Sequence, residues 1–258
     1  MNEDARISAS IASVPPVFPP VLAPRLGIVM LDTCFPRPLG DVGHPDSWGV
    51  ATERLVVPGA WPDKVVQSGA ALRDAGVVPE FKDAVRALAQ QQGVRAITTS
   101  CGFLVLLQRE LQSVSAVPVV TSSLLLLPGL LRNERKVGVL TISAARLGDE
   151  HLAAAGVAPE QLGNVVVQGV DPNGEFANAI LGNRAAMDLE RAAADVVAAA
   201  VVLRQRAPDL RTVVLECTNM PPSAGRISEA TGLRVVTLMD SPVLRRALGL
   251  GPGLGLGL

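Results

Sequence analysis

The stretch Arg95-Ala-Ile-Thr-Thr-Ser-Cys101 has a counterpart in Arg211-Thr-Val-Val-Leu-Glu-Cys217, so that the two cysteines lie 116 positions apart. Each stretch is an apolar, β-branched run that ends in a cysteine and is followed by residues that can open a helix. The match continues downstream at the same offset, where Val119-Val120-Thr121 corresponds to Val235-Val236-Thr237. We therefore predict two copies of one α/β unit, each with a cysteine at the carboxyl end of a strand.

An upstream pair of strands supports this repeat. Arg25-Leu-Gly-Ile-Val-Met-Leu-Asp32 resembles Lys136-Val-Gly-Val-Leu-Thr-Ile-Ser143, with a slip of five residues in the offset. Helical patterns fall between the predicted strands, namely at Pro79–Gln92, Phe103–Gln112, Met187–Arg206 and Pro221–Thr231. Such alternation predicts an α/β fold with mostly parallel sheets, right-handed crossovers and flanking helices. Ligands bind outside the carboxyl ends of the strands in such sheets, which is where both cysteines fall.

The predicted organisation is two pseudo-symmetric lobes with the active site in the cleft between them. We expect an extended, Pro-rich leader at 1–24, a first lobe at 25–124 with Cys101, and a second lobe at 125–238 with Cys217. Residues 239–258 are expected to form a terminal helix and a Gly-Leu tail that return to the first lobe. Thr33–Asp63 is rich in Pro and Gly, which predicts a long loop with one short strand at Leu55–Val57; a loop of this length is usually functional.

Composition excludes several classes of partner. The net charge is −1, aromatic residues make up 3% of the chain and tyrosine is absent, which argues against nucleic acid. The apolar runs are interrupted, for example by Pro128 and Asp195, well short of the roughly 18–20 residues that a membrane span needs. Glu3 and Asp4 open the chain with no apolar segment behind them, so no signal peptide is expected. We expect a cytoplasmic protein with a small-molecule ligand, and a homo-oligomer is compatible with this composition.

The paired cysteines are the main candidates for chemistry. A single buried cysteine is most often a small hydrophobe. At a strand-to-helix junction, however, N–H groups and the helix dipole stabilise a thiolate, which would bring a thiol of reference pKa about 8.5 toward neutrality. A nucleophile of the protease type needs a histidine; His44 lies in the Pro/Gly loop and His151 on a helix, and both are interpreted as structural or solvated. A zinc site needs more ligands than the strand ends supply, and no metal is expected.

Two opposed thiols suit the removal and replacement of a proton on opposite faces of one carbon. The motifs Thr98-Thr-Ser-Cys101-Gly-Phe and Leu215-Glu-Cys217-Thr-Asn-Met-Pro-Pro222, with Leu31-Asp32-Thr, resemble the aspartate/glutamate racemase superfamily over roughly residues 25–240. That superfamily includes amino-acid racemases, hydantoin racemases, maleate isomerases and arylmalonate decarboxylases. Its racemases work without pyridoxal phosphate, so the resemblance implies no cofactor.

The resemblance implies roles for particular residues. Cys101 and Cys217 match the two catalytic thiols, and Thr218 matches a hydroxyl residue that binds the substrate carboxylate. Asn219 stands where glutamate racemases commonly have histidine, and Gly102-Phe103 stands where they have Asn-Thr, which leaves room for a less polar substrate.

Other predicted site residues lie at strand ends. Asp32 corresponds to an acidic residue near one thiol and is equally well read as a turn cap. The hydroxyls of Ser100 and Ser122 are candidates for holding a carboxylate, with Ser122 preferred to Ser143. Cys34, in the proline-rich loop, is expected to take no part.

Three hypotheses follow. The first is a cofactor-independent racemase or epimerase of a small carboxylate-bearing substrate, with an aspartate- or glutamate-like amino acid expected, that moves a proton between opposed cysteines. The second is a decarboxylase or cis–trans isomerase of a small diacid. The third is a non-catalytic carboxylate-binding protein.

Overall fold

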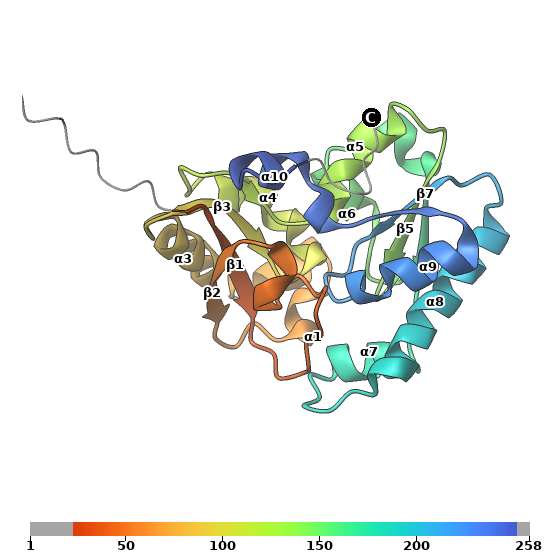
Figure 1. The fold of residues 1–258 in the computed structure, drawn as a ribbon, viewed down its shortest axis with the longest axis horizontal. Helices are drawn as coiled ribbons and strands as arrows, with labels where there is room; N and C mark the ends of the chain where they lie inside the picture. Colours follow the sequence, from red (N-terminus) through yellow and green to blue (C-terminus); the bar gives the residue numbers. More distant parts are fainter. Residues whose placement is uncertain (1–22, 252–258) are drawn as a thin grey trace, which may run out of the picture.

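The computed structural model describes residues 23–251, so the expected leader at 1–24 and the Gly-Leu tail lie almost entirely outside the described residues. Two four-stranded parallel sheets form the centres of two lobes (Figure 1). The first has the order β2-β1-β3-β4, built from β1 (Arg25–Leu31), β2 (Ala51–Val57), β3 (Val94–Thr99) and β4 (Val119–Val120). The second has the order β6-β5-β7-β8, built from β5 (Val137–Thr141), β6 (Val165–Gly169), β7 (Thr212–Leu215) and β8 (Arg234–Val236).

The two sheets share one topology, which confirms the predicted α/β repeat. Position by position, β1 corresponds to β5, and β3, which precedes Cys101, corresponds to β7, which precedes Cys217. All the strand pairs are parallel. The central strands are buried along nearly their whole length, as the continuous apolar runs of β1 and β5 require.

Helices and short 3-10 turns connect the strands. In the first lobe they are η1 (Pro45–Trp48), α1 (Pro62–Val65), α2 (Gly69–Asp74), α3 (Val78–Ala89), η2 (Gly102–Leu107) and α4 (Gln108–Gln112). The connection from the first sheet to the second consists of η3 (Ser123–Leu126) and α5 (Leu127–Leu131). In the second lobe the helices and turns are α6 (Asp149–Ala154), η4 (Pro159–Asn164), α7 (Glu175–Leu181), α8 (Leu189–Arg206), η5 (Pro221–Ser223) and α9 (Ala224–Thr231). The described chain closes with η6 (Leu238–Asp240) and α10 (Pro242–Ala247).

The two faces of the first sheet are covered by different parts of the chain. On one face α3 buries Phe81, Val85 and Leu88, the three apolar positions of its helical pattern. On the other face a separate cluster joins β1 residues such as Ile28 to Trp48 of the long loop and to Leu244, Leu248 and their neighbours at the carboxyl end. The chain therefore crosses back to the first lobe after β8, and α10 lies over the first sheet (Figure 1).

Several local predictions need correction. The strand expected at Leu55–Val57 is the longer β2, which pairs with β1 along all seven of its residues. The helix expected over Phe103–Gln112 begins as a 3-10 helix and becomes α-helical only at Gln108. The segments α1, α2 and α7 were not predicted, because each is at most seven residues long and shows too little of a helical period.

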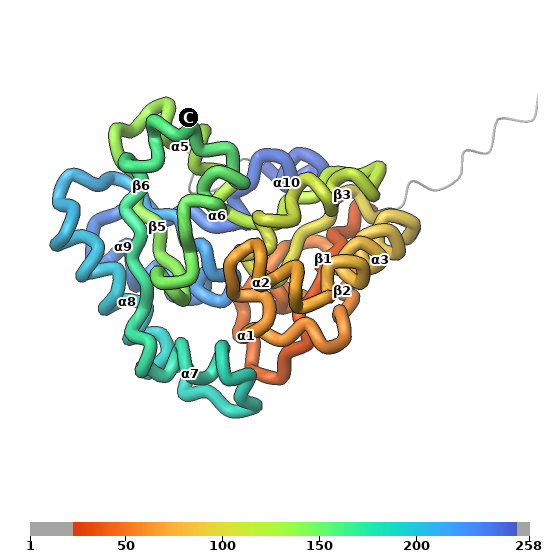
Figure 2. The backbone as a smooth tube through the Cα atoms, turned by 180° about the vertical axis from the view of Figure 1, so that it is seen from behind, coloured from red at the N-terminus to blue at the C-terminus, as the bar shows by residue number. Residues whose placement is uncertain are grey.

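Loops from both lobes meet between the two sheets. Val42 N donates to Thr218 O at 3.1 Å, and the Ser123 hydroxyl donates to Leu215 O at 2.7 Å. Lower in the same interface, α1 of the first lobe contacts α7 of the second (Figure 2). Within residues 23–251, no helix has both the length and the apolar character that crossing a bilayer requires.

Candidate active site

The two repeat-related cysteines line one small cavity between the lobes. Cys101 directly precedes η2, and Cys217 follows β7, so each lies at the carboxyl end of a central strand. The cavity is also lined by Ser100, Phe103, Glu216, Thr218 and Asn219. Its free volume is about 20 Å3 and each cysteine is 7% exposed, so the closed site has room for about one water molecule.

The remaining wall of the cavity is apolar. It consists of side chains from both lobes, namely Leu31, Phe35, Pro62, Val66, Ile142 and Ile180. An apolar wall favours uncharged groups and methyl groups of a ligand, and it strengthens every electrostatic interaction inside the cavity because water is excluded.

Burial decides the protonation of both thiols. Burial, followed by repulsion from Glu216, raises the pKa of Cys101 from 9.0 to about 12. The same two causes raise the pKa of Cys217 well above its ordinary value. The expectation that N–H groups and the helix dipole bring a thiol pKa toward neutrality was therefore wrong for the closed site, in which both thiols are protonated at neutral pH.

The surroundings of the two thiols differ. The backbone N–H groups of Phe103 and Leu104 at the start of η2 and the positive charge of Arg37 all lower the pKa of Cys101, whereas at Cys217 the backbone N–H of Asn219 is the lowering group. The Cys217 thiol lies 3.6 Å from Asn219 Oδ1, to which it donates, and the charge of Asp41 raises its pKa further. Cys101 is thus the thiol whose environment better supports a thiolate.

Glu216 is a site residue that the sequence analysis missed. Its Oε2 accepts a hydrogen bond from the Thr141 hydroxyl at 2.8 Å, while its Oε1 is buried without a partner among the described residues. Burial raises the pKa of Glu216 from 4.5 to about 8. The signal was present in the sequence, since an acidic residue stands directly before Cys217 at the end of an otherwise apolar strand.

A second polar cluster reaches the cavity from the long loop of the first lobe. The buried Asp41 carboxylate accepts from Arg37 Nη1 at 2.8 Å and from Asn219 Nδ2 at 2.6 Å. Asn219 in turn accepts the hydrogen bond of Cys217. The cluster connects a loop that the sequence marked as functional to the second thiol, although neither Arg37 nor Asp41 was predicted.

Most of the predicted site residues lie in the cavity wall. Ser100, Phe103, Thr218 and Asn219 line it together with the two cysteines. The Thr218 hydroxyl donates to Ser100 O at 2.6 Å, which joins the two cysteine-bearing loops.

Three predicted residues are not among the cavity-lining residues. The Asp32 carboxylate accepts from Gly59 N at 2.9 Å and caps the turn after β2, in line with the alternative reading of that residue. Ser122 accepts from Leu124 N at 3.2 Å and caps η3. Gly102 packs against Glu216 so closely that a Cβ would overlap with Glu216 O and Oε1.

The residues expected to be outside the chemistry have other roles. His151 is buried with its ring 4.9 Å from that of Phe103, and its Nε2 lies 3.2 Å from Gln67 O of the first lobe. His44 caps η1 through Nδ1. Cys34 is exposed, and its thiol donates to Asn183 O at 2.8 Å. In the part of the chain that the structure describes, no group of three or more His, Cys, Asp and Glu is placed to hold a metal ion.

Comparison with solved structures defines the class of fold. Arylmalonate decarboxylase superposes with a TM-score of 0.55 at 18% identity over 88% of this chain and 92% of that chain. Allantoin racemase from Pseudomonas fluorescens gives 0.54 at 16% identity, covering 89% and 93%. Aspartate racemase from Picrophilus torridus gives 0.53 at 13% identity, covering 90% and 96%. The fold is that of the aspartate/glutamate racemase superfamily, which confirms the resemblance seen in the sequence.

Comparison with curated proteins is more specific, although no protein-family model matches the chain. The chain is 33% identical over 216 residues to a dimethylsulfoniopropionate lyase of Durusdinium sp. clade D, covering 81% of this chain and 70% of that protein. It is 32% identical over 241 residues to dimethylsulfoniopropionate lyase 3 of Emiliania huxleyi, where it spans 61% of the relative's length. The chain belongs to the dimethylsulfoniopropionate lyase family.

Proposed function

We propose that this protein is a lyase that splits dimethylsulfoniopropionate into dimethyl sulfide and acrylate. The observation that carries the proposal is the 33% identity over 216 residues to a dimethylsulfoniopropionate lyase, in a chain whose two buried thiols line one cavity. The proposed substrate is therefore a smaller, achiral carboxylate and not the amino acid that the sequence led us to expect. In both, the proton is removed from the carbon next to the carboxylate.

The reaction needs one base and no redox partner. A base removes a proton from the carbon next to the carboxylate, and the electron pair of that C–H bond becomes the new carbon–carbon double bond. The C–S bond breaks at the same time, and its electron pair leaves with sulfur as neutral dimethyl sulfide. The base retains the proton. Racemisation in this superfamily starts with the same proton removal, so one site architecture suits both reactions.

Cys101 is assigned as the base. The backbone N–H groups of Phe103 and Leu104 and the charge of Arg37 lower its pKa, whereas at Cys217 the backbone N–H of Asn219 is the lowering group and the thiol donates to Asn219 Oδ1. In the empty, closed cavity the raised pKa keeps Cys101 protonated. A bound sulfonium cation would lower that pKa, because an opposite charge a few ångströms away in a water-excluded site favours the ionised thiol. The positive charge of the bound substrate therefore helps to generate the Cys101 thiolate, which then removes the proton next to the substrate carboxylate.

The cavity wall suits the other end of the substrate. The two methyl groups of a dimethylsulfonium suit the apolar side chains contributed by both lobes, among which are the aromatic side chains of Phe35 and Phe103. At the polar side, the Ser100 hydroxyl accepts from Leu31 N at 2.9 Å and keeps its own proton for a carboxylate oxygen. The expected carboxylate role of Thr218 and the expected contact of Asn219 with the substrate remain part of this proposal.

Incubation of the purified protein with dimethylsulfoniopropionate tests the proposal. Headspace gas chromatography should detect dimethyl sulfide, and proton NMR should detect acrylate in equal amount. The Cys34→Ser variant serves as a control that should match the wild type, since Cys34 does not line the cavity. Absence of both products, with a protein that melts cooperatively, would refute the lyase function.

A racemase of a small carboxylate substrate is the second candidate. The observation in its favour is that both thiols line the cavity, although elimination needs only one base. In deuterated water a two-base enzyme exchanges the α-hydrogen of its substrate while optical rotation is lost. Exchange with aspartate, glutamate or a hydantoin, without release of dimethyl sulfide, would favour this candidate. Maleate and arylmalonates in the same panel test the isomerase and decarboxylase alternatives.

A further inference from the structure

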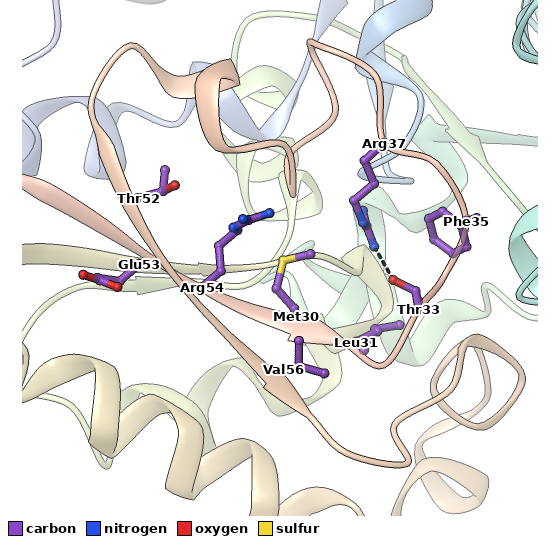
Figure 3. A pocket seen from close by; sticks show the side chains of 9 residues that line it. All are labelled: Met30, Leu31, Thr33, Phe35, Arg37, Thr52, Glu53, Arg54 and Val56. Atoms are coloured by element: carbon purple, nitrogen blue, oxygen red, sulfur yellow. Dashed lines mark hydrogen bonds between the residues drawn. The ribbon is translucent and has the colours of Figure 1, made fainter. Parts of the chain in front are cut away.

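A second, open pocket lies beside the closed thiol cavity. It has a volume of about 600 Å3 and lies where β1, β2 and the loop after β1 meet (Figure 3). This volume falls in the range of roughly 300–1,000 Å3 that is usual for small-molecule sites. The thiol cavity, in contrast, has about 20 Å3 of free space. A ligand can thus be held beside the thiols before it can reach them.

The two spaces share part of their walls. Leu31 and Phe35 line both the outer pocket and the thiol cavity. Phe35 belongs to the loop after β1, and its side chain is 6% exposed. Phe35 is therefore the aromatic side chain that the two walls have in common.

The outer pocket is positively charged. Arg54, from β2, and Arg37, from the loop, extend into it on either side of Met30 (Figure 3). Within residues 23–251, Arg54 forms no ion pair with a carboxylate, and the contact of its guanidinium is Gly43 O at 3.5 Å. Glu53 also lines the pocket, but its carboxylate is paired with Arg25.

Arg37 connects the pocket to the thiols. Its guanidinium lies 4.7 Å from the centre of the Phe35 ring, and its Nη2 donates to the Thr33 hydroxyl at 3.1 Å. Through Nη1 it binds the buried Asp41, which accepts from Asn219, the hydrogen-bond partner of Cys217. An anion that binds Arg37 from the pocket side competes with Asp41 and perturbs the loop that carries Phe35.

We propose that the outer pocket is a second carboxylate-binding site, in which Arg54 and Arg37 hold the anionic end of the substrate before Phe35 moves aside and admits it to the thiols. The identity of the anion as substrate rests on the proposed function. The existence of the charged access route does not rest on the proposed function, and it can be tested without substrate.

Alkylation of the buried thiols provides the test. In a Cys34→Ser background, Cys101 and Cys217 are labelled in parallel with iodoacetate, which is anionic, and with iodoacetamide, which is neutral, and each site is quantified by peptide mass spectrometry. The rate with iodoacetate divided by the rate with iodoacetamide at the same thiol does not depend on the fraction of thiolate. It therefore reports how much a negative charge on the reagent speeds its access to the thiol. Arg54→Gln should lower this ratio about threefold or more at low ionic strength, because it removes an attractive charge from the access route.

Two comparisons make the result specific. Arg226→Gln removes the same charge from the exposed face of α9 in the other lobe, where Arg226 pairs with Glu190, and should leave the ratio unchanged. Phe35→Ala should raise both rates by about tenfold or more with little change in their ratio, because a shielding side chain is lost. Phe35→Leu, which keeps most of the buried volume, should give a smaller acceleration and guards against a Phe35→Ala protein that folds poorly.

An unchanged ratio in Arg54→Gln, or unaccelerated labelling in both Phe35 variants, would overturn the proposal. If the protein also releases dimethyl sulfide, Arg54→Gln should raise KM and leave kcat unchanged, since Arg54 is outside the thiol cavity. A protein that releases no dimethyl sulfide but shows the lower ratio would contradict the proposed function while the charged access route stands.

Discussion

At the residue scale, the most informative feature is a carboxyl group enclosed with two thiols. Glu216 is 1% exposed, has one oxygen without a partner among the described residues, and is the main charged group that raises both thiol pKa values. Charges in such an enclosed site interact strongly because little water screens them. The protonation of Glu216 therefore influences how readily either thiol ionises.

Replacing this carboxyl should change how stability depends on pH. The folded-state pKa of Glu216 is about 8, above its ordinary 4.5, so its contribution is favourable below about pH 4.5 and is lost as the pH rises through 8. Glu216→Gln keeps the shape and the contact with Thr141 but cannot ionise. The difference in melting temperature between variant and wild type should grow from pH 5 to pH 8.5, as measured by differential scanning calorimetry. A difference in melting temperature that stays constant from pH 5 to pH 8.5 would contradict a buried, titrating Glu216.

The sequence predicted the cysteines but not their charged neighbours. Two cysteines at equivalent positions of a repeat can be recognised in the sequence alone, and so can Thr218 and Asn219, which follow Cys217 directly. Asp41 and Arg37 are 178 and 182 positions away from Asn219 in the chain, and only the folded loop brings Asp41 to it. The effect of burial on the thiol pKa could not be predicted either, because it depends on how tightly the two lobes close.

At the scale of elements, the junctions between strand and helix determine the site. Gly102 follows Cys101 and begins η2 with its Cα against Glu216. A side chain at this position would push the two cysteine-bearing loops apart. The absence of a side chain, which the sequence analysis connected with a less polar substrate, is first of all a packing requirement between the lobes.

Adding one methyl group tests this requirement. Gly102→Ala should destabilise the protein by about 1–3 kcal/mol, since the new Cβ overlaps with backbone and side-chain atoms of Glu216. Gly225→Ala, in α9, where a Cβ meets open space, should be neutral or stabilise the protein by up to about 1 kcal/mol. Urea denaturation measures both, and equal stability of the two variants would show that the contact between Gly102 and Glu216 is not tight.

Elements with a clear period could be predicted, and short ones could not. The strands β1, β3, β5 and β7 consist mostly of apolar or β-branched residues, and α3 and α8 repeat their apolar residues with a helical period, so the sequence located all of them. The part of β2 before Leu55 is Ala-Thr-Glu-Arg, and only its pairing with β1 makes it a strand. Likewise α7 is stabilised by burial of Phe176 and Ile180 in the hydrophobic core rather than by its own propensity.

At the scale of the whole molecule, α10 packs the carboxyl-terminal part of the described chain against the first lobe. After β8 the chain leaves the second sheet, and α10 buries Leu244 against the first one. The sequence analysis expected this return, and the structure shows which face of the first sheet the helix covers. The long loop after β1 lies under the same helix, because Val42 and Trp48 belong to the same apolar cluster.

A substitution in α10 should therefore lower the stability of the first lobe, although α10 lies more than 200 residues after β1 in the chain. Leu244→Ala should cost about 2–5 kcal/mol, the usual range for a fully buried leucine. The adjacent Val243 is 50% exposed, and Val243→Ala should change the stability by no more than about 0.5 kcal/mol. Thermal denaturation distinguishes the two, and an unaffected Leu244→Ala protein would mean that α10 does not support the first lobe.

The central claim is that Cys101 removes the α-proton of a sulfonium carboxylate in a cavity that it shares with Cys217. Its most direct test is the rate of dimethyl sulfide release by Cys101→Ser and by Cys217→Ser, each checked for wild-type folding. Cys101→Ser should lose about 10²–10⁴-fold in kcat, because a serine hydroxyl near neutral pH is too weak an acid to supply the base. Cys217→Ser should retain clearly more activity, since elimination requires only one base and the serine can still donate to Asn219. Release at the wild-type rate by Cys101→Ser, or an inactive Cys34→Ser beside active variants of the two cavity thiols, would contradict the account.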